Sequence, residues 1–80
     1  MPIPPDPPLA RLVRDDEERP VFMLGWARYV DGSWWARVTW IDDHGAHPRP
    51  RAEWVPSDAL HPIQGEDYRR LPRIQLRTAP

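Results

Sequence analysis

The clearest hydrophobic pattern in the chain lies in the segment SWWARVTWI, residues 33–41. From Trp34 to Trp40 every second residue is apolar, whereas the residues between them are a mixture of polar and apolar types. A repeat of two is typical of an antiparallel strand with one face against the core and one face toward solvent. The pattern therefore predicts a strand that turns Trp40 toward the core and turns Trp35 and Arg37 away from it.

Two further strands are predicted on either side of this segment. VFMLGWARYV, residues 21–30, is rich in β-branched and aromatic residues and ends at the Asp31-Gly32 pair, which is a strong signal for a tight hairpin turn. RAEWV, residues 51–55, follows a polar connection that contains glycine and proline. These segments predict three strands joined by turns.

Shorter elements are expected at both ends of this sheet. LARLVR, residues 9–14, can form a strand or one turn of helix, and HPI, residues 61–63, can form a last short strand. PSDAL, residues 56–60, begins with proline and carries Ser57 and Asp58, whose side chains can cap a single helical turn. The whole series favours an all-β fold, a small five-stranded β-barrel with a single 3-10 turn.

The chain divides by composition into an arm, a barrel and a tail. Residues 1–19 start with MPIPPDPP, which cannot continue a helix or fill a central strand, and end in the acidic run DDEER, which is expected to form a solvated loop. Residues 20–64 contain the strand signals of the barrel. Residues 65–80 are predicted to form a basic tail. The proline-rich arm is either a linker or a segment that an aromatic groove binds.

Composition limits the classes of protein to consider. With 80 residues and no cysteine, the chain makes one small domain without disulfides or thiolate metal sites, so large aromatic side chains must supply its stability. The formal net charge of −1 creates no overall attraction to nucleic acid or membrane, and no apolar run is long enough to span a bilayer. We expect a cytoplasmic protein with no membrane contact. All 11 basic residues are arginine, which is typical of a GC-rich genome and favours a bacterial or phage origin.

The second half of the chain resembles a known domain family. The tryptophan pair at 34–35 and the segment AEWVPSDALHPI at 52–63 are similar to the distal hairpin and the closing 3-10 turn of Src-homology-three domains. The resemblance implies a five-stranded Src-homology-three-like barrel in which Trp34 and Pro56 contact a peptide ligand and Trp54 precedes a buried valine. Strand alternation instead places Trp34 in the core, and both interpretations stay open.

The first hairpin resembles a related branch of the same superfold. LGWARYVDGSWWARV, residues 24–38, is similar to the first hairpin of Tudor and PWWP domains. Domains of this branch build aromatic cages that hold methylated lysine or arginine by cation–π attraction. The resemblance implies that Trp26, Trp35 and Tyr29 are candidate cage residues.

The sequence offers no catalytic or metal-binding constellation. His44 and His47 lie in one loop beside two aspartates but lack a third fixed ligand, so solvated side chains are the preferred interpretation. No serine is accompanied by a recognisable arrangement of histidine and acid, and the chain has no glycine-rich phosphate loop. We therefore expect neither enzymatic activity nor a cofactor or metal.

Binding is the function that the composition favours. Five tryptophans exceed what the interior of so small a barrel readily holds, and large exposed aromatic residues usually mark contact surfaces. We expect a non-catalytic protein-interaction module that binds a peptide or a partner surface. Its candidate site residues are Trp35, Trp54, Trp34, Pro56, Tyr29 and Trp26.

Two alternative functions remain open. In the first, the barrel binds nucleic acid by stacking Trp35 on bases while arginines contact the phosphates. In the second, the chain is a small phage-encoded or accessory subunit that docks on a larger complex and modulates it, through the proline arm and the arginine tail. The sequence does not indicate an oligomeric state. The arginines of the first alternative are Arg37, Arg69, Arg70, Arg73 and Arg77.

Overall fold

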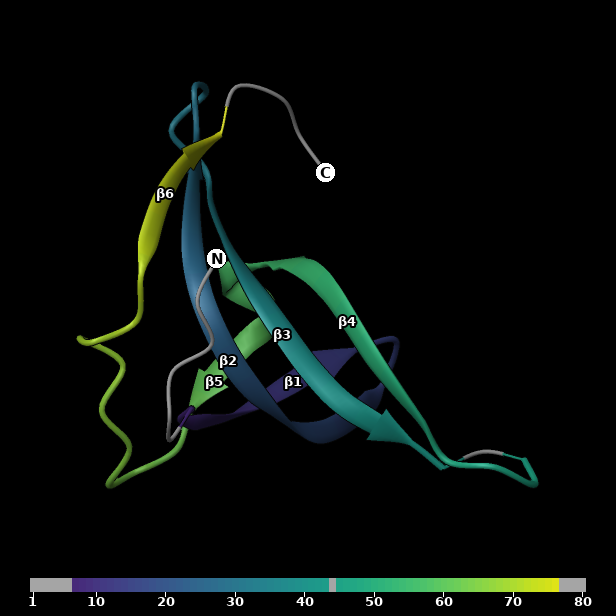
Figure 1. The fold of residues 1–80 in the computed structure, drawn as a ribbon. Coiled ribbons are helices and arrows are strands. Elements are labelled where there is room, and N and C mark those ends of the chain that lie inside the picture. Colours follow the sequence, from purple (N-terminus) through teal and green to yellow (C-terminus); the bar gives the residue numbers. More distant parts are fainter. Residues whose placement is uncertain (1–6, 44, 77–80) are drawn as a thin grey trace.

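The computed structural model describes residues 7–43 and 45–76 (Figure 1). This part of the chain forms six β-strands and one 3-10 turn, η1, and it has no helix long and apolar enough to cross a membrane. The expected all-β fold with a lone 3-10 turn is confirmed, with one strand more than expected. The elements are β1 (Leu9–Arg14), β2 (Glu17–Tyr29), β3 (Trp34–Asp42), β4 (Arg49–Pro56), η1 (Ser57–Ala59), β5 (Leu60–Pro62) and β6 (Arg73–Leu76).

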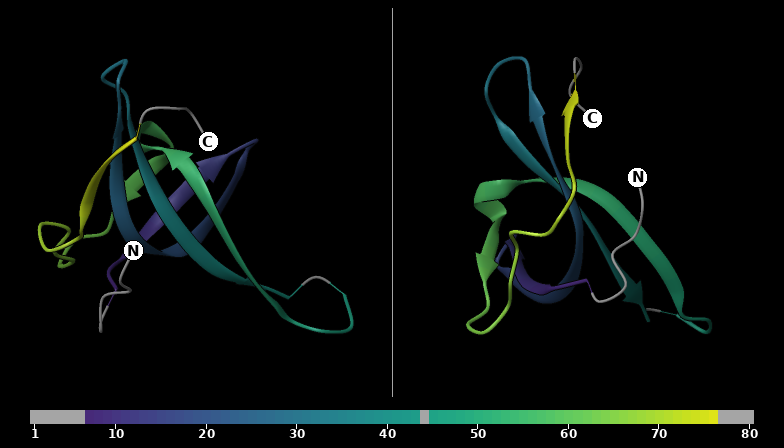
Figure 2. Two further views of the ribbon diagram at one scale, coloured as in Figure 1. Left: turned by 45° about the horizontal axis from the view of Figure 1, so that its top comes forward. Right: turned by 60° about the vertical axis from the view of Figure 1, so that its left-hand side comes forward.

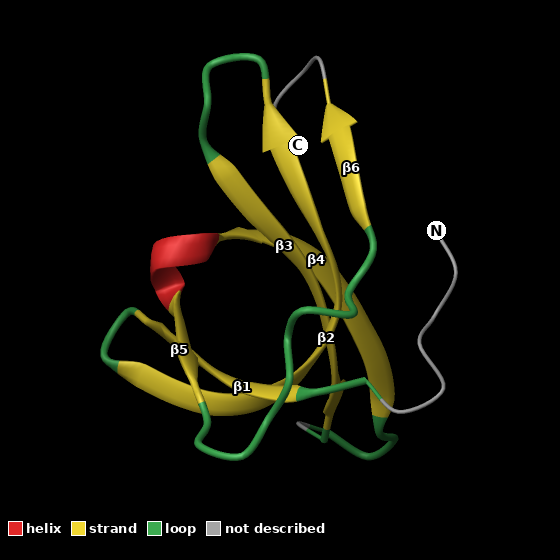
Figure 3. Ribbon diagram, turned by 90° about the vertical axis from the view of Figure 1, so that its left-hand side faces the viewer, coloured by secondary structure: helices red, strands yellow, loops and turns green. Residues whose placement is uncertain are grey.

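The strands form a single sheet that curls around the core. Its order is β4-β3-β2-β1-β5 with antiparallel neighbours, and β6 pairs with β2 in parallel. β2 is the longest strand, and β3 runs along one of its edges while β1 and then β6 occupy the other. Figure 3 shows the ring that β1 to β5 make, and Figure 2 shows β6 standing beside the projecting β2–β3 hairpin.

The core lies inside this ring, where one face of β3 meets β1, β2 and β4. Val38 and Ala36 are fully buried and Trp40 is 8% exposed, which confirms that this face points inward. Met23 of β2 is the cross-strand partner of Val38, and a β-bulge follows between Met23 and Gly25. The remaining core residues are Ala10, Leu12, Val21, Val55 and Leu71.

The acidic run at residues 15–19 is not the loop that the sequence predicts. Only residues 15–16 form a turn, with positive φ angles of 53° and 61°, and β2 already begins at Glu17. The strand tolerates acidic residues because its start is exposed to solvent. Glu18 is also paired with Arg11 of β1 at 3.1 Å, so the charges stabilise the β1–β2 ladder instead of a loop.

The sheet extends beyond residues 20–64 at both ends of the chain. β1 precedes this range, and β6 forms from the segment predicted as a basic tail. Tyr68 ties the segment before β6 to the barrel, because its hydroxyl donates a hydrogen bond to the Leu9 carbonyl at 2.6 Å and accepts one from the Ile63 amide at 2.8 Å. The predicted tail is therefore partly a strand of the sheet.

One described part of the proline-rich arm packs against the barrel. Pro8 is buried, and its carbonyl accepts a hydrogen bond from the Met23 amide at 2.8 Å. This bond continues the β1–β2 ladder by one position beyond Leu9. Residues 1–6 of the arm lie outside the described residues.

Candidate binding surfaces

The β2–β3 hairpin carries aromatic residues on both faces of the sheet. Cross-strand partners share a face, and Trp35 pairs with Ala27 of β2, whereas Trp34 pairs with Arg28 on the opposite face. The outer face is formed by the outward-facing residues of β2, β3 and β4. Its aromatic end comprises Tyr29, Trp35, Arg37, Trp54 and Pro56, and its apolar end comprises Phe22, Thr39, Ile41, Pro50 and Ala52. The rim groove on the opposite face is lined by Trp26, Trp34, Ser57 and Arg73, and Arg28 lies beside it as the cross-strand partner of Trp34.

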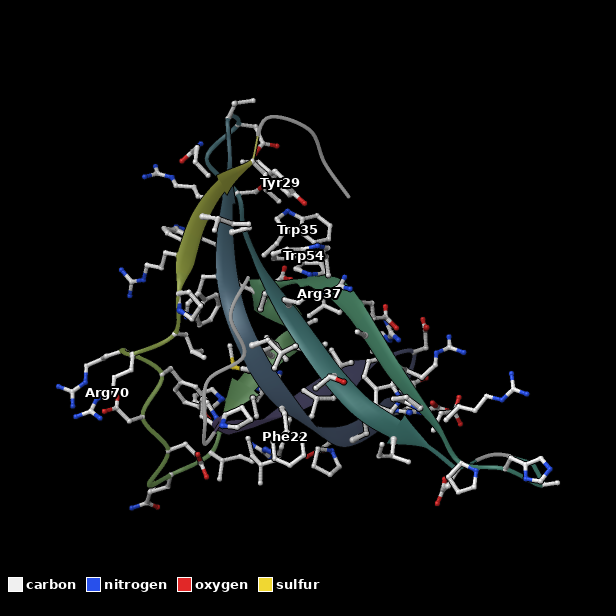
Figure 4. All side chains as sticks on the ribbon, in the orientation of Figure 1. Phe22, Tyr29, Trp35, Arg37, Trp54 and Arg70 are labelled. Atoms are coloured by element: carbon white, nitrogen blue, oxygen red, sulfur yellow. The ribbon has the colours of Figure 1, made fainter. Side chains whose placement is uncertain are left out.

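At the aromatic end of the outer face, the side chains contact one another along β3. The Trp35 ring meets the Tyr29 ring edge to face, with centroids 5.5 Å apart, and its Nε1 donates a hydrogen bond to Ser33 Oγ at 3.1 Å. The Arg37 guanidinium lies over the Trp54 ring, 5.7 Å from its centroid. Figure 4 shows this series of side chains on one side of β3. Trp35 and Trp54 are half-buried, so part of each side chain remains accessible.

The turn at the end of the hairpin holds this cluster in place. The Asp31 carboxylate accepts hydrogen bonds from the Ser33 hydroxyl at 2.7 Å and from the Ser33 amide at 2.9 Å, and they lower the pKa of Asp31 below its usual value. Gly32 has a φ of 89°, which glycine adopts without strain. The predicted turn at this pair is confirmed. It fixes the Ser33 hydroxyl where it accepts the indole N–H of Trp35.

Tyr29 supports the cluster from below instead of presenting its ring to solvent. The residue is 3% exposed, and its hydroxyl has no hydrogen-bond partner among the described residues. Burial raises the pKa of the Tyr29 phenol, and the negative charge of Asp31 raises it further. A buried hydroxyl without a partner costs about 1–3 kcal/mol. Tyr29 therefore presents almost no accessible surface and supports the position of the Trp35 ring.

The outer face continues as an apolar surface away from the hairpin. Phe22 is 43% exposed and Ile41 is 62% exposed, although both are large apolar side chains. Their neighbours on this face include Pro50 and Ala52 of β4. Arg37 is the one charged residue among the outward-facing positions that the β2–β3 and β3–β4 ladders align.

The rim groove lies where the hairpin projects beyond the barrel. Trp26 pairs with Arg73 of β6, and Arg28 pairs with Trp34 on the next rung of the same face. The Arg28 guanidinium lies 5.7 Å from the centroid of the Trp34 ring. An adjoining hollow of about 580 Å³ shares Trp26 and Arg73 and is completed by residues 65–69. The groove itself has a volume of about 300 Å³ and is lined by Trp26, Trp34, Ser57 and Arg73.

Trp34 is exposed although it lies on the inward-facing side of β3. It is 39% exposed, whereas Ala36, two residues further along the strand, is fully buried. The pair Ala36–Val55 is the last inward-facing pair of the β3–β4 ladder, so β4 does not cover the side chain of Trp34. Alternation therefore predicts the side of Trp34 correctly and its burial wrongly.

The three candidate cage residues do not share one face of the sheet. Trp26 lies in the rim groove, while Tyr29 and Trp35 lie on the outer face. An aromatic cage needs rings that surround a common point. Trp35 and Tyr29 contact each other edge to face and leave Trp26 on the far side of the strand.

The arginines that the sequence associates with nucleic acid do not form one patch. Arg37 lies on the outer face, and Arg73 lines the rim groove. Arg69 is held at 3.1 Å by a carboxylate of its own loop, and Arg70 points away from the barrel in Figure 4. Arg77 lies outside the described residues. Only Arg73 is placed beside an exposed tryptophan in a concave surface.

Sequence reasoning missed two residues at the rim groove, Arg28 beside it and Ser57 in its lining. Arg28 follows Trp26 with the period of two and faces Trp34 across the turn, so pairing the two predicted strands could have found it. Ser57 is predicted as a cap of the helical turn, but η1 begins at Ser57 and Pro56 occupies the capping position. Its place in the groove depends on the fold of β4 and could not be found locally.

Neither metal chemistry nor similarity to known proteins directs a choice between the two surfaces. Within residues 7–43 and 45–76, no three histidine, cysteine, aspartate or glutamate side chains lie close enough together to hold a metal ion. Comparison with protein-family models, curated proteins and solved structures finds no match for the chain. The contacts and charges of the outer face and the rim groove are therefore the basis for a functional proposal.

Proposed function

We propose that this chain is a non-catalytic protein-interaction module that binds a partner protein through its outer face. The observation that carries the proposal is the accessible apolar surface that runs from Trp35 and Trp54 to Phe22 and Ile41. A continuous exposed apolar surface is typical of an interaction site. Tryptophan is also enriched among binding hot spots, because it buries a large area at a small entropic cost.

The charge on the outer face indicates the chemistry of the partner. Arg37 contacts the Trp54 ring and forms no ion pair with a described residue. A partner that covers the face must compensate this cation, because an unpaired buried charge costs on the order of several kcal/mol. We therefore infer an apolar partner surface that carries a carboxylate opposite Arg37.

The same charge argues against pairing of two copies through the outer face. A two-fold dimer brings the same patch together from both copies. The aligned outward-facing positions carry no acid, so neither copy offers a carboxylate to Arg37 of the other. The proposed partner is a different protein, which includes a larger complex that the chain would join as an accessory subunit.

The finer identity of the barrel is part of the proposal. A Src-homology-three-like arrangement is supported by the meander β2-β3-β4, by η1 directly after β4, and by the pairing of β5 with β1. In such domains the residue that matches Trp34 contacts the ligand, but here Trp34 lies in the rim groove. The proposed use of the outer face is therefore different from the peptide site that the resemblance implies.

Affinity capture with matched variants tests the outer face. The chain serves as bait in a lysate of its source organism, and captured proteins are quantified by mass spectrometry for the wild type, Phe22→Asp and Ile41→Asp. Each change places a charge at an exposed position of the apolar end, and we expect capture of the partner to fall roughly tenfold or more. The control Val30→Asp adds the same charge at an exposed position of the hairpin turn and leaves capture unchanged.

The captured partner then allows a direct measurement of the role of Arg37. Calorimetric titration is expected to show roughly tenfold weaker binding for Arg37→Ala, because the partner's carboxylate loses its cation. Equal capture by all variants contradicts the proposal. The proposal is also contradicted if Ile41→Asp still captures every protein that the wild type captures.

A further inference from the structure

The rim groove and the position beside it bring together two tryptophans and two arginines on one face of the sheet. One rung of the sheet pairs Trp26 with Arg73, and the next rung on the same face pairs Arg28 with Trp34. Such rungs are two residues apart, a separation of roughly 7 Å along a strand. Each rung therefore presents one flat aromatic ring and one guanidinium at neighbouring positions.

The arginines at the rim groove belong to the half of the described arginines that lack acidic partners. Neither Arg28 nor Arg73 forms an ion pair with a described residue, and the Arg28 guanidinium lies over the Trp34 ring. Their hydrogen-bond donors are therefore available to an anion. The arginines that do lie within 4.0 Å of a carboxylate are Arg11, Arg14, Arg19, Arg51 and Arg69.

The two acids of the loop that leads to β6, Glu66 and Asp67, are engaged in hydrogen bonds. The Glu66 carboxylate accepts a hydrogen bond from the Leu9 amide at 3.3 Å. Asp67 accepts hydrogen bonds from the Arg69 side chain and amide, which lower the pKa of Asp67 to about 2. Two further acids lie near this end of the sheet: Asp58 follows Ser57 in η1, and Asp31 lies in the hairpin turn, where its carboxylate accepts hydrogen bonds from Ser33. The remaining described acids lie in or next to the β1–β2 turn, at the end of β3 and in β4, where Glu53 is paired with Arg14. The lining of the groove itself carries Arg73 and no acid, so the net charge of −1 does not describe it.

This combination of groups matches the two parts of a nucleotide. A base of any sequence stacks on an indole ring, and guanidinium groups bind phosphate oxygens through paired hydrogen bonds. The volume of about 300 Å³ is at the small end of the range for ligand pockets, which suits a single base. We propose that the rim groove binds a nucleotide unit, with its base against Trp34 and its phosphate between Arg28 and Arg73. The unit is supplied by a free mononucleotide or by single-stranded nucleic acid.

This site is separate from the outer face and does not depend on its function. The two surfaces lie on opposite faces of β2 and β3 and share no residue. Protein binding through Ile41 and nucleotide binding through Trp34 can therefore fail independently. Variants of one surface serve as controls for the other.

Fluorescence anisotropy with a labelled single-stranded oligothymidylate of about 12 nucleotides at about 50 mM salt tests the groove. Trp34→Ala and Arg73→Ala are each expected to weaken binding roughly tenfold or more. Arg73→Ala should also reduce the slope of log affinity against log salt by about one, because one phosphate contact is lost. The matched controls Trp54→Ala and Arg49→Ala remove side chains of the same two types, one from the outer face and one from the start of β4. They should leave the affinity for the oligonucleotide unchanged.

Competitors separate the sources of the nucleotide. Competition by adenosine monophosphate at concentrations similar to those of the unlabelled single strand identifies a mononucleotide site. Competition by the unlabelled single strand alone identifies a nucleic-acid site. Both results support the proposal. A duplex of the same sequence that binds as tightly as the single strand overturns it, because duplex bases cannot stack on Trp34.

Three further outcomes overturn the proposal. The first is the absence of binding by both the oligonucleotide and adenosine monophosphate at about 50 mM salt. The second is a loss of affinity in Trp54→Ala and Arg49→Ala equal to that in the groove variants. The third is a polyglutamate peptide that binds with the same dependence on Arg73 while the oligonucleotide does not bind, which identifies an acidic-peptide site. Melting curves confirm that each variant is folded, and Arg73→Gln replaces Arg73→Ala if the latter is not.

Discussion

The two faces of β3 use similar residues with different results. On the inner face, Ala36, Val38 and Trp40 are buried, whereas on the outer face Trp35 is half-buried and Ile41 is mostly exposed. Hydropathy does not separate the faces, because each carries a tryptophan and a β-branched apolar residue. The curl of the sheet does, because it encloses one face and leaves the other convex. Enclosure by neighbouring strands therefore decides which tryptophan is structural and which is available to a partner.

The contacts between tryptophan and arginine show the same difference. On the inner face, the Arg14 guanidinium lies 5.9 Å from the Trp40 ring centroid and donates two hydrogen bonds of 2.8 Å to Glu53. On the outer face, Arg37 lies 5.7 Å from the Trp54 ring centroid and has no acidic partner among the described residues. In the first group the charge of the arginine is compensated within the barrel, although the buried Trp40 Nε1 has no hydrogen-bond partner among the described residues. In the second group the arginine has no anion, and in the proposed complex the partner supplies it.

The largest expected effect comes from a charge on the enclosed face. Val38→Asp places an unpaired carboxylate at a fully buried position, with a cost on the order of several kcal/mol, enough to unfold a small domain. Ile41→Asp, on the other face of the same strand, should change stability by about 0.5 kcal/mol or less. Circular dichroism and urea titration measure both. A folded Val38→Asp protein would show that the faces of β3 are assigned in reverse.

Replacing single tryptophans by alanine tests the same comparison between the two faces with smaller effects. Trp40→Ala should cost about 3–5 kcal/mol, because it leaves a cavity in the core. Trp35→Ala should cost about 2 kcal/mol through loss of its contact with Tyr29 and its hydrogen bond to Ser33. Trp54→Ala should cost about 1 kcal/mol. If urea titration gives three equal losses, the outer face belongs to the core and its role in binding loses support.

Two tyrosine hydroxyls extend the comparison to hydrogen bonds. The Tyr68 hydroxyl bonds to the backbone of Leu9 and Ile63, whereas the buried Tyr29 hydroxyl has no partner among the described residues. Tyr68→Phe should destabilise the fold by about 1–3 kcal/mol, because it leaves backbone groups unpaired. Tyr29→Phe should be neutral or stabilise by up to about 1 kcal/mol. Thermal melts that show equal losses would mean that the Tyr29 hydroxyl is bonded after all.

Features that depend on neighbouring residues could be predicted from the sequence. Alternation placed Trp40 in the core, and the Asp31-Gly32 pair marked the hairpin turn, because strand faces and tight turns are set locally. β6 could not be predicted, since RIQL is too short to show a repeat and its partner strand is distant in sequence. The candidate aromatic residues were recognised by type alone. Their division between two surfaces depends on the β2–β3 register and on where the β3–β4 ladder ends, which the exposure of Trp34 reflects.

The smallest expected effect concerns the ion pair beside Trp40 and depends on pH. The hydrogen bonds from Arg14 lower the pKa of Glu53 below its ordinary value of 4.5, although burial opposes them. A carboxyl group whose pKa is lowered by folding stabilises the fold above its unfolded pKa, and this contribution is lost as the pH falls through the folded-state pKa. Both side chains are partly exposed, so the contribution is about 1 kcal/mol or less.

Urea titrations of the wild type and Glu53→Gln should therefore differ at neutral pH and converge as the pH falls below the folded-state pKa of Glu53. Glu17→Gln is the matched control, because it removes the same charge from a largely exposed position where Glu17 reaches Arg19 only at 3.7 Å, and it should cost less stability at neutral pH than Glu53→Gln. A Glu53→Gln deficit that persists unchanged in acid would mean that Glu53 acts through packing. In that case Arg14 would be as open to an anion as Arg37 is. The contrast between an inner face whose arginine is paired with an acid and an outer face whose arginine is not would then no longer hold.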